Sequence, residues 1–169
     1  MLNRILIVAL LLVPSLVSAS KFPEFSDYIV PVTTKNTVGD IELDLSGIDW
    51  RIKDRIEYGA VGGSVNFAGK YYLLQIGCGT ECISAWLIDL DSGMIFNSNL
   101  KPSVWGGFCF RADSNLLIAN PKTNSDYLAI EEALGSPMPA RMNTAAYLWD
   151  DESFKLLTDS GDVVFESCD

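Results

Sequence analysis

The sequence predicts a single, mainly β domain built as an antiparallel meander of hairpins, with one or two short helices. Apolar and polar residues alternate along much of the chain, as they do in strands that bury one face. Clusters of Gly, Asp, Ser and Asn interrupt this alternation at the short intervals that hairpin turns require. Because a flat sheet would leave an apolar face in water, we expect the sheet to be curled or doubled.

The first 19 residues are predicted to form a secretory signal peptide. Arg4 precedes an apolar run over residues 5–13, and small residues stand before the expected cut after Ala19. The alternative is an uncleaved membrane anchor, but Pro14 interrupts the run, which is shorter than the roughly 20 residues that span a bilayer. We therefore expect a secreted or periplasmic protein without stable membrane insertion, whose single domain comprises residues 20–169.

The chain has a net charge of −10, from 22 acidic and 12 basic residues. The predicted signal peptide contains one basic and no acidic residue, so its removal would change the net charge to −11. A field of this sign repels nucleic acid and attracts cationic partners. The simpler alternative is that the acidity only keeps an exported protein in solution.

A helix is predicted around the segment IDWRIKDRIEY. Ile48, Ile52 and Ile56 recur every four residues and would form one apolar stripe along it. Ser46 is expected to cap the start of the helix, and Gly59 to adopt the left-handed conformation after its end. The isoleucine stripe would then pack the helix against the sheet.

Residues 126–134 are predicted to form a second helix, on weaker signals. Gly135 and two prolines follow, and these residues end helices. We therefore expect residues 134–142 to form a loop, whose two methionines pack within the loop and do not bind a cofactor.

The strands are predicted from the alternation and from the turns between them. In the first strand, residues 72, 74 and 76 share one face, and residues 71, 73 and 75 share the other. The expected strands are 71–76, 84–90, 94–96, 108–110, 116–119, 145–149, 154–157 and 163–165. Short turns join several of these strands into hairpins, which predicts antiparallel pairing.

The chain has no histidine and four cysteines, namely Cys78, Cys82, Cys109 and Cys168. The absence of histidine excludes Ser-His-Asp and Cys-His catalysis and the common zinc sites that use histidine. An all-cysteine zinc site remains as an alternative. Such sites usually use two closely spaced pairs of cysteines, which this chain lacks, and export favours oxidation of the cysteines to disulfides. A redox site would need Cys-x-x-Cys, whereas Cys78 and Cys82 are four positions apart. We expect no metal and no cofactor.

Four cysteines allow three disulfide pairings. We favour Cys78 with Cys82, because a turn between two hairpin strands brings residues four apart within bridging distance. Cys109 would then pair with Cys168. Loop entropy predicts a stabilisation of about 2 kcal/mol from the short bridge and about 4 kcal/mol from the long one.

The residues inside the short bridge, Gly79, Thr80 and Glu81, are the candidate binding residues. A disulfide-closed ring holds its side chains in a fixed shape and loses little conformational entropy on binding. Glu81 is the only charged residue of the three. The alternative is that GCGTEC is only a structural turn.

Acidic residues and tryptophans are candidates for a calcium site or a sugar cleft. The acids lie in DLDSG (Asp89 and Asp91) and WDDES (Asp150, Asp151 and Glu152), and the tryptophans are Trp50, Trp86, Trp105 and Trp149. Neither acidic segment has the ligand spacing of a calcium loop, and Asp and Ser are the usual residues of tight turns. We expect the tryptophans to pack in the core or on strands. No catalytic residue is assigned.

Several motifs together resemble those of a family of uncharacterised secreted bacterial proteins. The motifs are NFAGKY at 66–71, GCGTEC at 77–82, WLIDLDSG at 86–93 and FRADSNLLIAN at 110–120, with an echo in YLWDDESFKLL at 147–157. The family's pattern runs NFAGHY, WGCGTxC, a Val-Asp or Leu-Asp strand with a Thr-Gly turn, and FRPDSRLL. The match covers roughly residues 50–120 and implies compartment and fold, not an activity. Lys70 departs from the pattern, because histidine is expected there.

A weaker resemblance is to the blades of β-propellers, whose hairpins often read as a strand, Asp-x-x-Ser/Thr-Gly and a second strand. The segment WLIDLDSG is similar to this pattern. A domain of this size would hold only part of a propeller. This resemblance implies a partial-propeller-like sandwich.

Two functions from different classes follow from these observations. The first is a secreted or periplasmic, non-enzymatic binding or inhibitory protein that recognises a cationic protein, such as an envelope hydrolase or a toxin. Some periplasmic lysozyme inhibitors insert a short disulfide-closed loop into the cleft of the enzyme. CGTEC is similar to that loop in being short and closed by a disulfide, but it differs in length and residues. The second is a carboxylate-dependent hydrolase acting on an envelope polysaccharide, which would need two carboxylates facing each other across a groove.

Overall fold

The computed structural model describes residues 22–80, 82–102, 106–121, 132–133, 135, 143–160 and 168. The predicted signal peptide and the last predicted strand, residues 163–165, lie outside the described residues. So does the second predicted helix with its following loop, apart from Glu132, Ala133 and Gly135.

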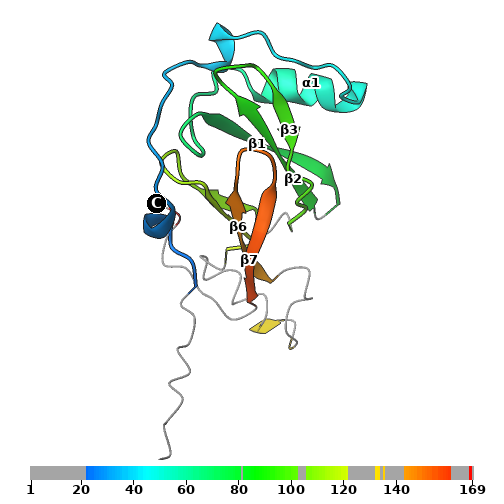
Figure 1. The fold of residues 1–169 in the computed structure, drawn as a ribbon. Helices are drawn as coiled ribbons and strands as arrows, with labels where there is room; N and C mark the ends of the chain where they lie inside the picture. Colours follow the sequence, from blue (N-terminus) through cyan, green and yellow to red (C-terminus); the bar gives the residue numbers. More distant parts are fainter. Residues whose placement is uncertain are drawn as a thin grey trace, which may run out of the picture.

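The described chain is mainly β, as the sequence predicts, with one short helix, two 3-10 turns and seven strands (Figure 1). The 3-10 turns are η1 (Phe25–Tyr28) and η2 (Val38–Asp40), and the helix is α1 (Trp50–Gly59). The first sheet contains β1 (Tyr71–Gly79), β2 (Cys82–Asp89) and β3 (Ile95–Asn97) in sequence order. The second contains β4 (Phe108–Phe110), β5 (Leu116–Ala119), β6 (Thr144–Trp149) and β7 (Phe154–Ser160), also in sequence order.

All neighbouring strands pair antiparallel, which confirms the predicted meander. Of the two expected arrangements, the chain adopts two separate sheets, and neither is curled or closed. The first hairpin pairs Tyr71 with Asp89 and Gln75 with Ala85. This register places the odd-numbered residues of β1 and β2 on one face of the sheet and the even-numbered ones on the other.

Helix α1 begins and ends differently from the sequence prediction. Its first turn is capped by Asp49, whose side chain accepts a hydrogen bond of 2.8 Å from the backbone N–H of Arg51. The predicted cap, Ser46, lies four positions before the first helical residue, and its backbone N–H donates to Asp44 Oδ1 at 2.9 Å. The left-handed glycine after the helix is Gly62, with φ of +71°, and not Gly59. Both predicted positions, Ser46 and Gly59, were therefore wrong.

Helix α1 covers the even-numbered face of the first sheet. Ile56 is fully buried there, and Ile48 and Ile52 are partly buried against the same cluster, which confirms the predicted isoleucine stripe. The buried residues of this layer are Val38, Ile56, Ala60, Leu74, Ile76, Ile88 and Leu90.

The odd-numbered face of the first sheet packs on the second sheet. Their shared core contains the ring of Tyr71, which meets that of Trp149 edge to face with centroids 5.5 Å apart. Such contacts add stabilisation beyond that of the buried apolar area. The buried residues of this core are Phe67, Tyr71, Leu73, Ala85, Leu87, Phe108, Leu117, Ala119 and Trp149.

The outer face of the second sheet is covered by the chain around η1. Leu116 and Ile118 of β5 are fully buried there, and Phe25 and Tyr28 pack against them. The hydroxyl of Ser114 donates a hydrogen bond of 3.0 Å to the carbonyl oxygen of Tyr28 and fixes η1 to the start of β5. The layers are therefore α1, the first sheet, the second sheet and the η1 segment.

Candidate functional site

Both predicted disulfides are present. Cys78 is bonded to Cys82, with Cα atoms 5.3 Å apart, and Cys109 to Cys168, with Cα atoms 5.4 Å apart. All four cysteines are used, so the structure has no all-cysteine zinc site and no free thiol. The long bridge is buried beneath the η1 segment, and the short bridge lies at the end of the β1–β2 hairpin.

The disulfide-closed end of this hairpin is exposed to solvent. Residues 77–80 are all exposed, whereas Ile76 just before them is buried. The register shifts between Gly77 and Gly79, so that Cys78 is the extra residue of a bulge. Gly79 has φ of +138°, a conformation that residues with a Cβ rarely adopt. Of the predicted binding residues, Gly79 and Thr80 therefore lie on the surface, and Glu81 lies outside the described residues.

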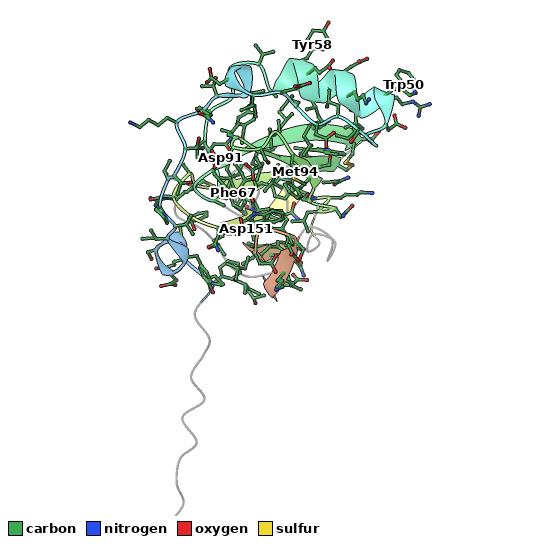
Figure 2. All side chains as sticks on the ribbon, turned by 45° about the horizontal axis from the view of Figure 1, so that its top comes forward. Trp50, Tyr58, Phe67, Asp91, Met94 and Asp151 are labelled. Carbon is green, nitrogen blue, oxygen red and sulfur yellow. A yellow bond between two sulfur atoms is a disulfide. The ribbon has the colours of Figure 1, made fainter. Side chains whose placement is uncertain are left out.

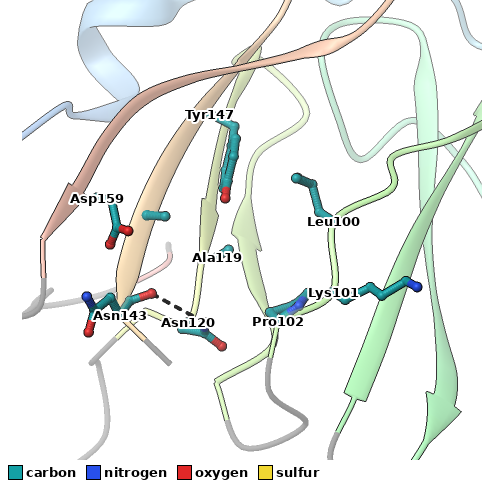
Figure 3. Close-up of a pocket in the computed structure, with 9 residues that line it drawn as sticks. Leu100, Lys101, Pro102, Ala119, Asn120, Asn143, Tyr147 and Asp159 are labelled. Carbon is teal, nitrogen blue, oxygen red and sulfur yellow. Dashed lines mark hydrogen bonds between the residues drawn. The ribbon is translucent and has the colours of Figure 1, made fainter. Parts of the chain in front are cut away.

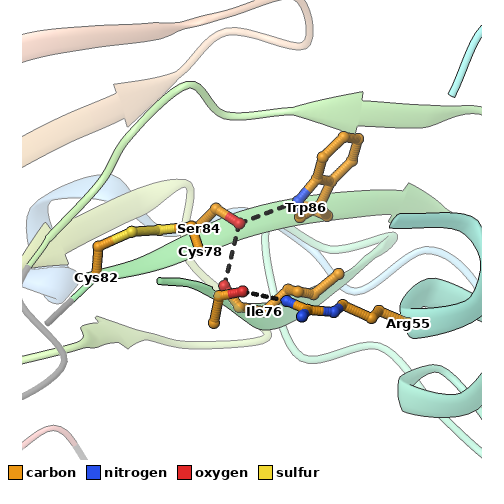
Figure 4. Close-up of a disulfide and its surroundings, with 7 residues drawn as sticks. Arg55, Ile76, Cys78, Cys82, Ser84 and Trp86 are labelled. Carbon is orange, nitrogen blue, oxygen red and sulfur yellow. Dashed lines mark hydrogen bonds between the residues drawn. A yellow bond between two sulfur atoms is a disulfide. The ribbon is translucent and has the colours of Figure 1, made fainter. Parts of the chain in front are cut away.

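The base of the ring is held by side chains from two layers (Figure 4). Arg55 of α1 donates from Nη1 to the carbonyl oxygen of Gly77. The hydroxyl of Ser84 donates to the carbonyl oxygen of Ile76 at 3.1 Å, and the indole N–H of Trp86 donates to the Ser84 hydroxyl at 3.2 Å. The residues before the ring are therefore held by helix α1 and by the partner strand β2.

Sequence reasoning missed Arg55 and Ser84 as supports of the ring. Arg55 is 22 positions from Gly77, and no local pattern links the two residues. The sequence contained one indication of the role of Ser84, because this polar residue lies on a face of β2 whose other residues are mostly apolar. A polar residue on a buried face needs a hydrogen-bond partner, and that requirement predicts a role for Ser84.

Asp89, the first acid of DLDSG, forms the turn hydrogen bonds that the sequence predicts. Asp89 Oδ1 accepts from the backbone N–H groups of Asp91 and Ser92, at 2.9 and 3.2 Å. Its Oδ2 lies 3.0 Å from the Lys70 ammonium. Burial opposes ionisation of Asp89, but the hydrogen bonds from the Asp91 backbone and from Lys70 outweigh it and lower the pKa of this carboxyl. Asp89 thus fixes the β2–β3 turn and anchors Lys70.

Asp150, the first acid of WDDES, fixes the β6–β7 turn in the same way. Asp150 Oδ1 accepts from the backbone N–H groups of Glu152 and Ser153, at 3.2 and 2.8 Å. The hydrogen bond from Lys155, followed by that from the Ser153 backbone, lowers the pKa of Asp150 to about 2. The turn therefore accounts for Asp150.

The tryptophans do not form one cleft. Trp149 is buried in the core between the sheets and Trp86 is half-buried, as predicted. Trp50 is 68% exposed on α1, so core packing was the wrong expectation for it; Figure 2 shows its side chain pointing outward on the same helix as Tyr58. The Arg51 guanidinium lies 5.4 Å from the Trp50 ring centroid and shields part of it. Trp105 lies outside the described residues.

One cavity of about 160 Å³ lies between the chain after β3 and the second sheet (Figure 3). Asn120, Asn143, Tyr147 and Asp159 contribute polar groups to it, and the Lys101 side chain extends away from Asp159. Burial, followed by the charge of Asp159, raises the pKa of Tyr147. Its phenol is therefore neutral at physiological pH and acts only as a hydrogen-bonding group.

A second cavity, of about 220 Å³, lies at the opposite end of β1 from the disulfide ring and is lined by one carboxylate, that of Asp151. Among the described residues, the first cavity also has a single lining carboxylate, that of Asp159. Glycoside hydrolysis needs two carboxyl groups across one cleft, at about 5 to 9.5 Å from each other. The described residues of these two cavities do not provide that pair.

In the part of the chain that the structure describes, no helix is long and apolar enough to cross a membrane. No group of three or more Cys, Asp or Glu side chains within that part is placed to hold a metal ion. Comparisons with protein-family models, curated proteins and solved structures found no match for this chain. The function is therefore inferred from the exposed ring and its supports.

Proposed function

We propose that this protein is an exported, non-enzymatic binding or inhibitory protein that presents the Cys78–Cys82 ring to a cationic protein partner. The observation that carries the proposal is that residues 78–80 of the ring are exposed, and that the residues before the ring are held by Arg55 and Ser84. A recognition loop that is already ordered loses little entropy on binding, so more of the contact energy appears as affinity.

The charge of the chain supports a cationic partner. The net charge is −10, and removal of the predicted signal peptide would make it −11. An acidic body speeds the encounter with a basic protein at low salt. Within the ring, Glu81 is the only ionisable side chain, so it is the residue expected to contact a basic or donor-rich cleft.

The two disulfides support export. Disulfides persist in oxidising compartments and are rare in the cytosol. Together with the signal-peptide pattern of residues 1–19, they favour a secreted or periplasmic location. Envelope hydrolases with a basic surface are the class of cationic partner that such a location makes accessible.

The proposal is tested by measuring association and dissociation of residues 20–169 on immobilised cationic envelope hydrolases, with lysozymes as the first probes. Association is expected to slow as salt rises, because screening shortens the reach of the charge field. Glu81→Ala is expected to speed dissociation. Glu57→Ala is the matched control, because it removes one exposed acid on α1 and leaves the ring intact.

Opening the ring is the second test. The double variant Cys78→Ser with Cys82→Ser keeps Glu81 and the net charge but removes the covalent closure. Affinity is expected to fall while the salt dependence of association persists. Hydrolysis of peptidoglycan by this protein alone would contradict the proposal and favour the polysaccharide hydrolase. Binding that is indifferent to salt and to Glu81→Ala would also overturn it.

A further inference from the structure

The cavity of about 220 Å³ lies far from the disulfide ring and is independent of the proposed function. Four separate stretches of the chain form it: residues 30–33, the turn before β1, the start of β5 and the β6–β7 turn. Three of these stretches belong to the motifs NFAGKY, FRADSNLLIAN and YLWDDESFKLL. Its lining includes Val30, Pro31, Ala68, Lys70, Asn115 and Asp151.

The wall of this cavity carries one group of each charge. Lys70 is held by Asp89 at 3.0 Å, and its ammonium lies 5.0 Å from the Tyr71 ring centroid. Burial opposes the charge of Lys70, but the hydrogen bond to Asp89 outweighs it and raises the pKa to about 12, so Lys70 stays cationic. An ammonium has three donors, and Asp89 occupies one of them. A ligand carboxylate can accept from a further one.

Asp151 provides the opposite charge. Its Oδ1 accepts a hydrogen bond of 2.9 Å from the Tyr71 hydroxyl, which comes from the buried core, and the residue itself is exposed. The second carboxylate oxygen is therefore available to a ligand donor. An anion alone would be repelled by Asp151 and a cation alone by Lys70, so the two groups together select a molecule that carries both charges.

The backbone on both sides of the cavity is left-handed. Ala68 has φ of +44° and Asp151 has φ of +70°, and both line the cavity. This conformation costs Ala68 about 1 to 2 kcal/mol, and such strain is concentrated at binding sites, whereas an aspartate in a turn adopts it more readily. The Tyr71 hydroxyl holds Asp151 in this conformation.

The apolar part of the lining restricts the ligand further. Val30, Pro31 and Ala68 form an aliphatic wall. Trp149 also lines the cavity but is only 3% exposed, so it presents no free ring face on which a sugar could stack. We propose that this cavity binds a small α-amino acid with an aliphatic side chain, whose ammonium contacts Asp151, whose carboxylate contacts Lys70 and whose side chain lies against Val30, Pro31 and Ala68.

Valine is the probe, and calorimetry on residues 20–169 is the measurement. Isovalerate, which lacks the ammonium, and isobutylamine, which lacks the carboxylate, are each expected to bind at least tenfold more weakly than valine. Asp151→Asn is expected to weaken valine binding at least tenfold, because asparagine keeps the left-handed conformation and an acceptor for Tyr71 but loses the charge. Lys70→Gln is expected to have an effect of similar size. Glu57→Gln and Lys35→Gln, at exposed positions, are the matched controls.

Chemical-shift mapping by NMR locates the site. Valine is expected to shift the amide signals of Thr33, Ala68 and Asn115, and to leave that of Asn143 in the other cavity unchanged. The proposal is overturned if valine does not bind, if it binds Asp151→Asn as tightly as the unmodified protein, or if the shifts fall elsewhere. Equal binding of isovalerate or isobutylamine would also overturn it. Lys70→Gln could unfold the β2–β3 turn, but the Asp151→Asn result does not depend on that variant.

Discussion

Arg55 of helix α1 donates a hydrogen bond to the carbonyl oxygen of Gly77, the residue directly before the Cys78–Cys82 ring. The bond links two layers of the fold, because α1 lies on the outer face of the first sheet and Gly77 lies near the end of β1. It is exposed, so water competes with it, and its effect is expected to be local.

Arg55→Ala is therefore predicted to loosen the base of the ring more than it destabilises the protein. Hydrogen exchange of the amides around Gly77 and Gly79 should speed up, with a loss of global stability of about 1 kcal/mol or less, because the bond is open to solvent. Arg51→Ala is the control, since Arg51 lies over Trp50 on the same helix. Unchanged exchange at the ring in Arg55→Ala would contradict the bracing role.

The two disulfides are predicted to differ in their contribution to stability. The bridge between Cys109 and Cys168 closes 59 positions, and that between Cys78 and Cys82 closes four. Loop entropy then predicts a loss of about 4 kcal/mol for a Cys109/Cys168 double serine variant and about 2 kcal/mol for the Cys78/Cys82 pair. Denaturant unfolding of both variants measures the difference, and equal midpoints would show that loop length does not govern stability here.

Acid is predicted to weaken the β6–β7 turn through Asp150. The folded pKa of this carboxyl is about 2, below its ordinary value of 3.8. The contribution of the ionised Asp150 to the free energy of unfolding is therefore fully present above about pH 4, and it is lost as the pH falls through 2. Asp150→Asn keeps an acceptor for the turn but loses the ion pair with Lys155. The variant should be less stable than the unmodified protein at neutral pH, and the difference should shrink between pH 4 and pH 2.

The measurement for that prediction is denaturant unfolding at pH 7, 4, 3 and 2. Glu57→Gln removes the same charge from an exposed site on α1 and serves as the control. The stability difference between Asp150→Asn and the unmodified protein could instead stay constant down to pH 2. That result would show that protonation of Asp150 is not coupled to folding.

Alanine substitution at two left-handed glycines is predicted to have unequal effects. Gly62 has φ of +71° and open space around its missing side chain, so Gly62→Ala should cost about 1 to 2 kcal/mol from conformation alone. Gly69 has φ of +78°, and a Cβ there would lie 2.2 Å from the carbonyl oxygen of Pro31. Gly69→Ala should therefore lose clearly more stability, and should also displace the chain beside the 220 Å³ cavity. Equal thermal midpoints of the two variants would argue against this close approach.

Much of the fold could be predicted from the sequence, because strands, turns and their faces depend on residues close together in the chain. The alternation in YYLLQI placed residues 72, 74 and 76 on one face of the first strand, and in the structure Leu74 and Ile76 are buried on that face. The spacing of four positions between the cysteines of GCGTEC predicted the short bridge, and the acids of DLDSG and WDDES predicted their turns. Each of these features involves hydrogen bonds or geometry within a few positions.

Other features were decided only by the tertiary structure. Asp49 caps the helix in place of Ser46 because α1 begins at Trp50. Trp50 points to solvent because the isoleucine stripe of the helix faces the sheet. The bond from Arg55 to Gly77 depends on how α1 lies across β1.

The cavity beside Asp151 depends on contacts between even more distant parts of the chain. Tyr71 and Asp151 are 80 positions apart, and their hydrogen bond exists because the two sheets pack face to face. Periodicity along a strand determines which face is buried, but it carries no information about which layer covers that face. That choice arises from the packing of all four layers together, where side chains from distant segments compete for the same space.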